Sequence, residues 1–203
     1  IAITPLGQGS IIYASDGKLQ RIEDKTSSGA LEVSYDNGRP VALEDSLSGR
    51  SITLEWNLSG QLVEIEDPSG YVWEMSYDQL GEKLLSITPP SSEATPPSFS
   101  FGYDATSGFL NTHDDLMENS YELSYYSSGS FENWMESWTD PASISSSFSY
   151  DSSVQGFSMV TTFTDGENRE SNFGFNSEGY LLEQWQEVGQ ELSSQQLGYS
   201  TEG

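Results

Sequence analysis

The sequence predicts an all-β fold of tandem β-hairpins that pair into a long curled or spiralling antiparallel sheet. Three observations predict it: short runs of alternating apolar and polar residues, a recurring dyad of an aromatic residue followed by Asp or Asn, and a glycine within six residues of each dyad. Alternation with period two is typical of half-buried strands, and glycine with Asp or Asn is typical of tight turns. No helical periodicity of useful length occurs.

The dyad recurs at nearly constant spacing along the whole chain. Counted from Tyr13, successive aromatic residues lie 22, 21, 21, 26, 22, 25, 25 and 24 residues apart. Nine copies in register indicate a repeat array, so residues 1–203 are predicted to form a single array of about eight to nine units. The clear copies are Tyr35-Asp36, Trp56-Asn57, Tyr77-Asp78, Tyr103-Asp104, Tyr150-Asp151 and Phe175-Asn176, and the weaker ones are Tyr13-Ala14, Tyr125-Tyr126 and Tyr199-Ser200.

Each unit is expected to be a hairpin of two strands. The strand that leads into a dyad alternates cleanly, but the strand that follows carries an apolar pair three residues apart, as in Leu62 and Ile65. That spacing would put the pair on opposite faces of a plain strand. Either a β-bulge intervenes or the first residue packs in the turn. We expect Trp73, Trp138 and Trp185 at inward, core positions of this register.

Two segments depart from the repeat. Four prolines predict a projecting loop over residues 89–98, from Pro89 to Ser98, because proline interrupts the pairing of strands. A second insertion places Trp134 between one hairpin and the next. An exposed, rigid aromatic residue is what a sugar-stacking platform needs, so Trp134 and Tyr126 are the candidate contacts for a glycan, with packing in the loop as the alternative.

Composition excludes several classes of protein. Seven Lys and Arg against 32 Asp and Glu give a net charge of −25, which argues against binding nucleic acid or anionic membranes. An aromatic content of 12% argues against disorder. The absence of cysteine excludes disulfides, thiolate metal sites and cysteine nucleophiles. No stretch of 18 apolar residues occurs, so no membrane insertion is expected.

The residues that could act in catalysis or bind a metal are each better explained by a structural role. The single histidine, His113, precedes two aspartates but occupies an inward position of its unit, so we expect it in the core. One acid recurs near a turn in most units, which favours capping of turns over paired carboxylates for glycoside cleavage. No cofactor is expected. Calcium is the cation that carboxylates and carbonyls would suit, although no EF-hand loop occurs.

The units resemble the YD repeats of RHS-repeat proteins. Each repeat of that family has, in order, a glycine, a leucine, an Asp-Pro pair, a glycine and a Tyr-x-Tyr-Asp motif. The unit from Leu62 to Asp78 matches this order best, and the resemblance covers essentially the whole chain. It implies a sheet that spirals into a hollow shell, as around toxins in bacterial toxin complexes and polymorphic toxins, or a barrel like that of teneurins. The self-cleaving segment that closes such shells has no match here, because Asp67-Pro68 lies mid-array in an ordinary turn.

These observations predict a non-catalytic structural scaffold of a secreted or cell-surface protein, forming part of a shell, tube or filament wall. The alternatives are a carbohydrate- or partner-binding adhesion module and an encapsulating shell segment of a toxin-delivery protein. The expected partners are neighbouring repeats or copies of the same protein. The chain is expected to be a piece of a longer protein, with sheet edges at Ile11-Ile12-Tyr13 and Leu197-Gly198-Tyr199 that continue into another repeat or copy.

Overall fold

Every regular element is a β-strand in the computed structural model, which describes residues 2–3, 9–25, 28–188 and 191–196. The chain divides into two compact units, Ile1–Ser100 and Phe101–Gly203. Both the dyad copy Tyr199-Ser200 and the predicted edge at Leu197-Gly198-Tyr199 lie outside the described residues. The strands are β1 (Ala2–Ile3), β2 (Ile11–Tyr13), β3 (Leu19–Glu23), β4 (Ala30–Asp36), β5 (Arg39–Asp45), β6 (Ser51–Trp56), β7 (Leu62–Glu66), β8 (Val72–Tyr77), β9 (Leu84–Thr88), β10 (Phe99–Tyr103), β11 (Leu110–Asp114), β12 (Ser120–Tyr125), β13 (Met135–Thr139), β14 (Ser145–Asp151), β15 (Met159–Thr164), β16 (Glu170–Phe175), β17 (Leu181–Val188) and β18 (Glu191–Gln196).

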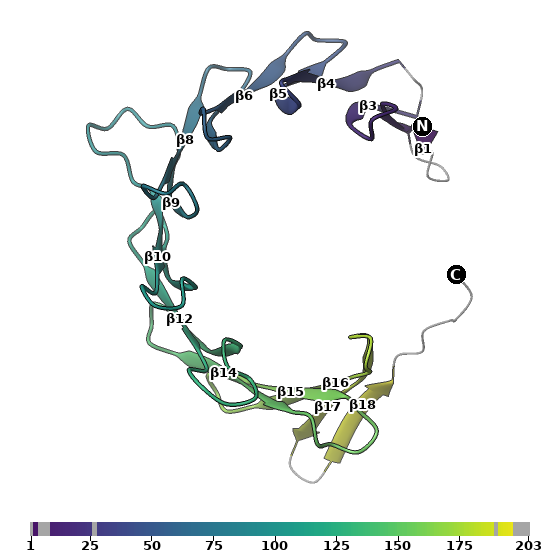
Figure 1. Cartoon of the computed structure of the whole chain (residues 1–203), viewed down its shortest axis with the longest axis vertical. Coiled ribbons are helices and arrows are strands. Elements are labelled where there is room, and N and C mark those ends of the chain that lie inside the picture. The colour runs from purple at the N-terminus through teal and green to yellow at the C-terminus, as the bar shows by residue number, and fades with distance from the viewer. Residues whose placement is uncertain (1, 4–8, 26–27, 189–190, 197–203) are drawn as a thin grey trace. The chain divides into compact units, whose positions relative to one another are not determined.

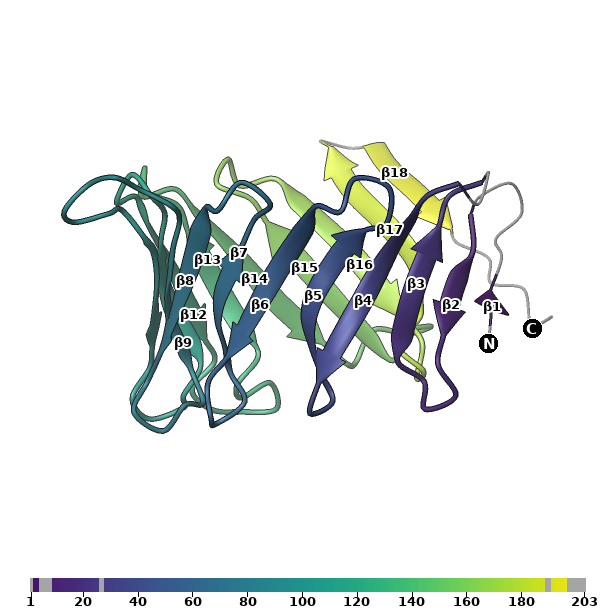
Figure 2. The same ribbon diagram turned by 90° about the horizontal axis from the view of Figure 1, so that it is seen from above.

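Strands that follow one another along the chain pair antiparallel, as a succession of hairpins (Figure 1). In the first unit the neighbouring strands β3 to β7 lie side by side, with turns at both ends (Figure 2). The all-β antiparallel fold predicted from the sequence is therefore confirmed. The predicted edge Ile11-Ile12-Tyr13 is paired with β1, through Ala2 opposite Ile12 and Ile3 opposite Ile11, and its continuation into another repeat or copy stays a prediction.

A β-bulge lies at the dyad and settles how the apolar pair is arranged. In the hairpin of β6 and β7, Leu54 is opposite Ile65 and Trp56 is opposite Leu62, so one residue of β7 is left over. The bulge therefore brings both members of the apolar pair to the same face. The same shift of register occurs at Ile12/Tyr13, Ser34/Tyr35, Glu55/Trp56, Ser76/Tyr77, Ser124/Tyr125 and Gly174/Phe175.

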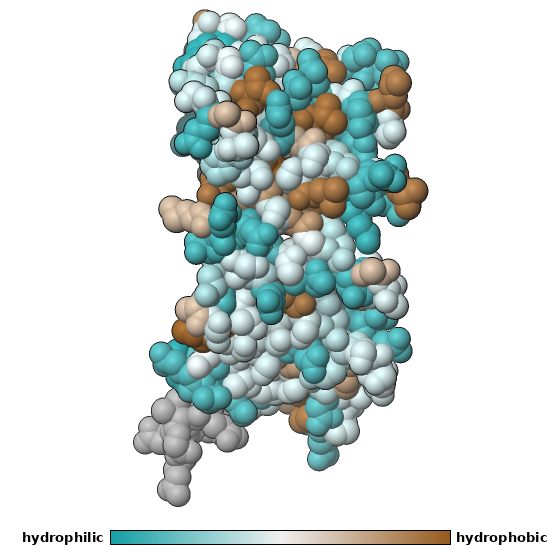
Figure 3. Space-filling view, turned by 90° about the vertical axis from the view of Figure 1, so that its left-hand side faces the viewer, coloured by the Kyte–Doolittle hydropathy of each residue, from teal (hydrophilic) through white to brown (hydrophobic). Residues whose placement is uncertain are grey.

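Each unit has an apolar face and a polar face. The apolar face carries cross-strand neighbours such as Ile65 and Trp73, whereas the polar face carries paired hydroxyls such as Ser124 and Ser137, whose oxygens lie 2.8 Å apart. Little of either face is deeply buried, since Ala30, Val160, Ser146 and Gly174 are the buried residues within the described ranges. On the face that Figure 3 shows, hydrophobic side chains are scattered among hydrophilic ones.

The tryptophans predicted as core residues need correction. Trp73 and Trp138 lie on the apolar face of their units but remain 37% and 39% exposed. Trp185 lies on the polar face, opposite Asn172. The bulge at Gly174/Phe175 aligns Leu181 with Phe175, and this register turns Trp185 to the other side of the sheet.

In five repeats the dyad aromatic residue bonds its hairpin to the one before it. Tyr77 Oη donates a hydrogen bond to the carbonyl oxygen of Leu62 at 2.9 Å, back across the sheet. Trp56 Nε1 donates to the carbonyl oxygen of Pro40 at 2.7 Å in the same way. The acceptor lies 15 or 16 residues earlier in each case, so the repeat fixes this contact as well as the strand pairing. The other examples are Tyr35 to Leu19, Tyr125 to Leu110 and Tyr150 to Met135.

Replacing Tyr77 by phenylalanine is expected to lower the free energy of unfolding by about 0.5–1.5 kcal/mol, because one half-buried hydrogen bond is lost while the ring is kept. Denaturant unfolding followed by tryptophan fluorescence measures the change. The control is Tyr71→Phe at a side chain that is 61% exposed, which should have little effect. Equal effects of the two substitutions would show that the dyad hydroxyl does not hold the hairpins together.

Candidate functional site

The recurring acids organise the turns. Asp67 Oδ1 accepts hydrogen bonds from the backbone amides of Ser69 at 2.7 Å and Tyr71 at 3.0 Å. These bonds satisfy amides that the reversal of the chain takes out of the strand ladder. The capping role expected from the sequence is therefore confirmed at these positions. Two such bonds, from amides two to four positions ahead, are also accepted by Asp45, Asp104, Asp115, Asp140, Asp165 and Asn176.

The turn at Asp165 makes stability depend on pH. The backbone amide of Arg169, and then its guanidinium at 2.7 Å, hold the pKa of Asp165 below its ordinary value of 3.8. Below that value the unfolded chain binds a proton that the folded chain still excludes. The stabilisation is therefore complete above about pH 4 and is lost as pH falls through the lower folded value.

We expect Asp165→Asn to flatten the loss of stability on acidification below pH 4. The amide Oδ1 keeps both turn hydrogen bonds, as Asn176 does in its own turn at 3.0 and 2.9 Å, but it does not titrate. Urea unfolding at a series of pH values measures the slope. The converse variant, Asn176→Asp, should steepen the loss. An Asp165→Asn profile parallel to that of the wild type would contradict the assignment.

His113 forms part of a ladder of stacked rings on the apolar face of the second unit. Its ring lies 5.3 Å from that of Phe101 and 5.6 Å from that of Tyr121, with planes inclined by 13° and 16°. Tyr121 continues the ladder to Trp138 at 6.2 Å, with planes 3° apart. The inward position predicted for His113 on the apolar face is confirmed, but the expected place in the core is wrong, because the residue is only half-buried. Its neighbours in the ladder are rings. Within the described ranges, no three His, Asp or Glu residues gather as metal ligands would.

The candidate residues Tyr126 and Trp134 are brought together by the loop between β12 and β13. The amide of Tyr126 donates to the carbonyl oxygen of Trp134 at 2.9 Å, and the Tyr126 hydroxyl donates to the carbonyl oxygen of Phe148 at 2.8 Å. Trp134 is 43% exposed and packs edge-on against Tyr150, with ring centroids 4.7 Å apart. Phe131 completes the cluster at 5.5 Å from Tyr150. Trp134 is thus partly exposed and also packed in the loop.

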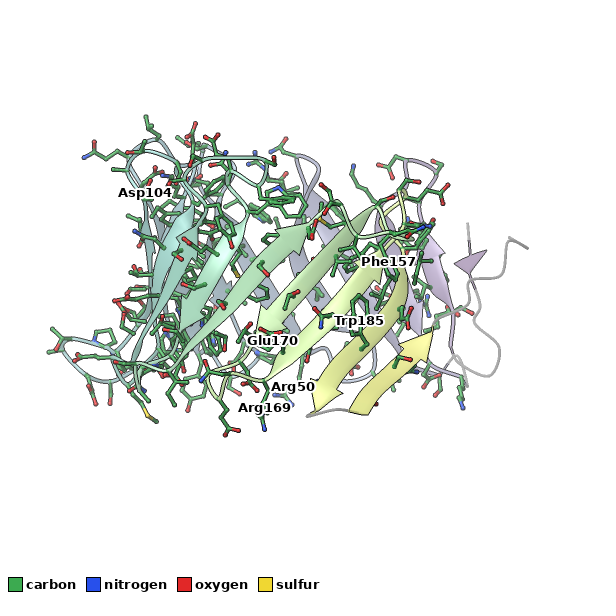
Figure 4. The ribbon with its side chains drawn as sticks, turned by 90° about the horizontal axis from the view of Figure 1, so that it is seen from below. Arg50, Asp104, Phe157, Arg169, Glu170 and Trp185 are labelled. Atoms are coloured by element: carbon green, nitrogen blue, oxygen red, sulfur yellow. The ribbon has the colours of Figure 1, made fainter. Side chains whose placement is uncertain are left out.

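A groove lies beside this loop and is lined by Tyr126 but not by Trp134. Its volume is about 650 Å³. We call it the loop groove, and the residues that line it include Asp104, Phe109, Asn111, Tyr125, Tyr126, Glu132 and Asn133. Figure 4 labels Asp104, which belongs to the turn between β10 and β11. Strand, turn and loop therefore all contribute to one concave surface in the second unit.

The proline loop lines a separate pocket in the first unit. Residues 89–98 join β9 to β10, and the prolines Pro89, Pro90 and Pro96 face Tyr71 and Glu74 across a pocket of about 600 Å³.

Sequence reasoning missed two sets of contacts. Phe157, from the segment between β14 and β15, stacks on Trp185 at 5.6 Å on the polar face (Figure 4). The residue after a turn glycine also reaches the dyad ring of the next hairpin, as Arg39 does over Trp56 at 5.8 Å. The recurrence of a long side chain after the glycine was the available signal for the second set. The further examples are Lys18 over Tyr35 and Phe109 on Tyr125.

Known proteins resemble the chain in structure rather than in sequence. No family model and no curated protein matches it. A solved chain from the crystal structure of TcdB2-TccC3-TEV is 13% identical with a TM-score of 0.50, over 96% of this chain and 12% of that chain. A chain of the Photorhabdus luminescens Tc holotoxin pore is 15% identical with a TM-score of 0.52, over 95% of this chain and 11% of that one. Among the residues that the structure describes, none form a helix with the length and hydrophobicity that crossing a bilayer requires. This chain therefore shares its all-β fold with about a tenth of the length of chains from Tc toxin assemblies.

Proposed function

We propose that the chain is a non-catalytic structural repeat scaffold of the RHS-repeat kind, forming part of a shell, tube or filament wall. The observation that carries the proposal is a recurring hydrogen bond from the dyad aromatic residue to the hairpin before it, as from Tyr77 to Leu62, which five of the dyads make. This contact joins one repeat to the next at five places along the chain. A wall needs such uniform lateral cohesion, because each repeat contacts only its neighbours.

The half-exposed apolar face supports a role within a larger assembly. Ile22, Ile52 and Trp73 are 38%, 37% and 37% exposed, although they lie on the apolar face of the first unit. Apolar area left in contact with water is area whose burial would stabilise an assembly, at roughly 25 cal/mol per Å². Neighbouring repeats or further copies of the protein are the partners that would cover it.

The absence of catalysis is part of the same proposal. The recurring carboxylates are engaged by turn amides, and His113 lies between aromatic rings. A panel of glycosides, esters and peptides should therefore show no turnover. Reproducible turnover that disappears when one acidic pair is replaced by amides would overturn this part of the proposal.

In its more specific form, the proposal is that the protein is secreted or lies at the cell surface and that it serves as a scaffold in a toxin complex. Both are supported by the likeness in fold to chains from a Tc holotoxin and by the YD-like repeats. The toxin-shell form predicts that the gene continues from the repeats into a C-terminal domain that varies between related genes. A gene without such a domain would favour a wall or filament that holds no toxin.

Association measured against salt tests the scaffold proposal. The chain carries a net charge of −25, so repulsion opposes contact between copies at low salt. Raising NaCl from about 0.05 M to about 1 M shortens the screening length from more than 10 Å to about 3 Å, while apolar burial persists. We expect the particle mass from light scattering to rise. A monomer at both salt concentrations would contradict an assembly built through the apolar face.

Matched variants on one strand locate the contact. Ile52→Asp adds a charge to the apolar face of β6 and should keep the protein monomeric at high salt. Thr53→Asp adds the same charge to the polar face of the same strand and should leave association intact. Thermal unfolding of both variants checks that they are folded. Loss of association in Thr53→Asp alone would assign the contact to the polar face.

A further inference from the structure

We propose that the loop groove binds a neutral carbohydrate. The groove has about 650 Å³ of space, within the range of small-molecule sites, and it lies in the second unit between the turn after β10 and the loop after β12. Nothing in the scaffold function requires it. The inference therefore stands or falls separately from the proposed function.

The groove exists because one connection departs from the repeat. In the hairpins before it, residues 57–61 join β6 to β7, residues 78–83 join β8 to β9 and residues 104–109 join β10 to β11, whereas the longer segment 126–134 joins β12 to β13. A repeat that serves only to pair strands needs no loop of this length. The additional residues build the groove wall, since Tyr126, Glu132 and Asn133 all line it.

This wall is held in place before any ligand arrives. The amide of Asn133 donates to the carbonyl oxygen of Tyr126 at 2.8 Å, and the Tyr126 hydroxyl is fixed on Phe148. Asn133 has a φ of 70°, a left-handed conformation that asparagine adopts more readily than most residues. Trp134 anchors the loop from behind through its contact with Tyr150. A pre-formed wall reduces the entropy lost on binding.

The lining favours a ligand with hydroxyl groups and no net charge. Phe109 and Tyr125 form a ring pair with centroids 5.0 Å apart, and such rings offer faces for the C–H groups of a sugar. Asn111 and Asn133 each provide an amide that donates and accepts, which matches the hydroxyls of a sugar. The charged residues of the lining, Asp104 and Glu132, are both acids, so an anionic ligand would be repelled.

Two matched glycine variants test the site. Asn133→Gly removes the amide side chain and keeps the left-handed backbone at no steric cost, so the loop should remain folded. Asn168→Gly makes the same change at another left-handed asparagine, with φ of 61°, in the turn before β16 and away from the groove. Because one side chain supplies one or two hydrogen bonds, binding should weaken about tenfold in Asn133→Gly and stay unchanged in Asn168→Gly.

The whole chain is titrated with maltotriose, cellobiose, lactose and N,N′-diacetylchitobiose, and binding is followed by saturation-transfer NMR and calorimetry. Saturable binding of at least one saccharide, weakened by Asn133→Gly alone, supports the proposal. Failure of all four saccharides to bind would overturn it, as would equal affinities of the two variants. Spermidine is the charged probe, and saturable binding of spermidine without any saccharide would overturn it too, by assigning the groove to a cation. The light-scattering result is independent of each of these outcomes.

Discussion

Replacing Tyr150 by alanine is expected to lower the free energy of unfolding by about 2–4 kcal/mol, the largest effect of a single substitution in the second unit. Tyr150 lies at the centre of an aromatic cluster, with ring centroids 4.7 Å from Trp134, 5.5 Å from Phe131 and 6.1 Å from Tyr126. Its hydroxyl also donates to the carbonyl oxygen of Met135 at 2.9 Å. Truncation removes both sets of contacts and leaves a cavity beneath the loop.

Two further variants separate the contribution of the Tyr150 hydrogen bond from that of its ring contacts. Tyr150→Phe removes only the hydrogen bond and should cost about 1 kcal/mol. Tyr71→Ala, at a side chain that is 61% exposed, should cost little. Urea unfolding monitored by near-ultraviolet circular dichroism reports the aromatic cluster directly. If Tyr150→Ala proved no more harmful than Tyr71→Ala, the cluster would not be what holds the loop of residues 126–134.

Gly174→Ala is expected to destabilise the protein by about 1–3 kcal/mol. Gly174 is a buried residue of the polar face, and a β-carbon there would collide with the ring of Phe157. The backbone of β16 is paired on both sides, with Val160 and Glu183 opposite this residue, so the strand cannot move away. The ring of Phe157 would have to leave Trp185 instead.

A double-mutant cycle separates this collision from the intrinsic preference of a strand for alanine over glycine. Phe157→Ala alone should destabilise, because it uncovers Trp185. The double variant should be more stable than the sum of the two single effects predicts, since without the ring the added methyl group meets no obstacle. Thermal unfolding of the wild type, the two single variants and the double variant measures the four stabilities that the cycle needs. Strict additivity would show that Phe157 does not pack on Gly174 in solution.

The candidate site was only partly accessible from the sequence. Trp134 lies in an insertion between two repeats, Tyr126 is the second residue of a weaker dyad, and the structure places both on one loop. Asn111 and Phe109 gave no signal, because they occupy ordinary places in their hairpin and join the groove only through the fold of the loop beside them. A groove made from strand, turn and loop has no local pattern along the chain.

The strands and turns of this protein follow from local patterns in the sequence. The alternation of apolar and polar residues located the strands, and the spacing of the dyads located the hairpins, because both depend on neighbours within a few residues. The turn acids were likewise predictable, since Asp67 bonds amides only two and four residues ahead. Which face of the sheet a side chain occupies depends instead on how the strands pair. The bulge after Glu55 brings Leu62 and Ile65 to one side, and the bulge after Gly174 turns Trp185 to the other. A shift of one residue reverses every later side chain of a strand, and that shift is set by the pairing with the neighbouring strand rather than by the strand itself.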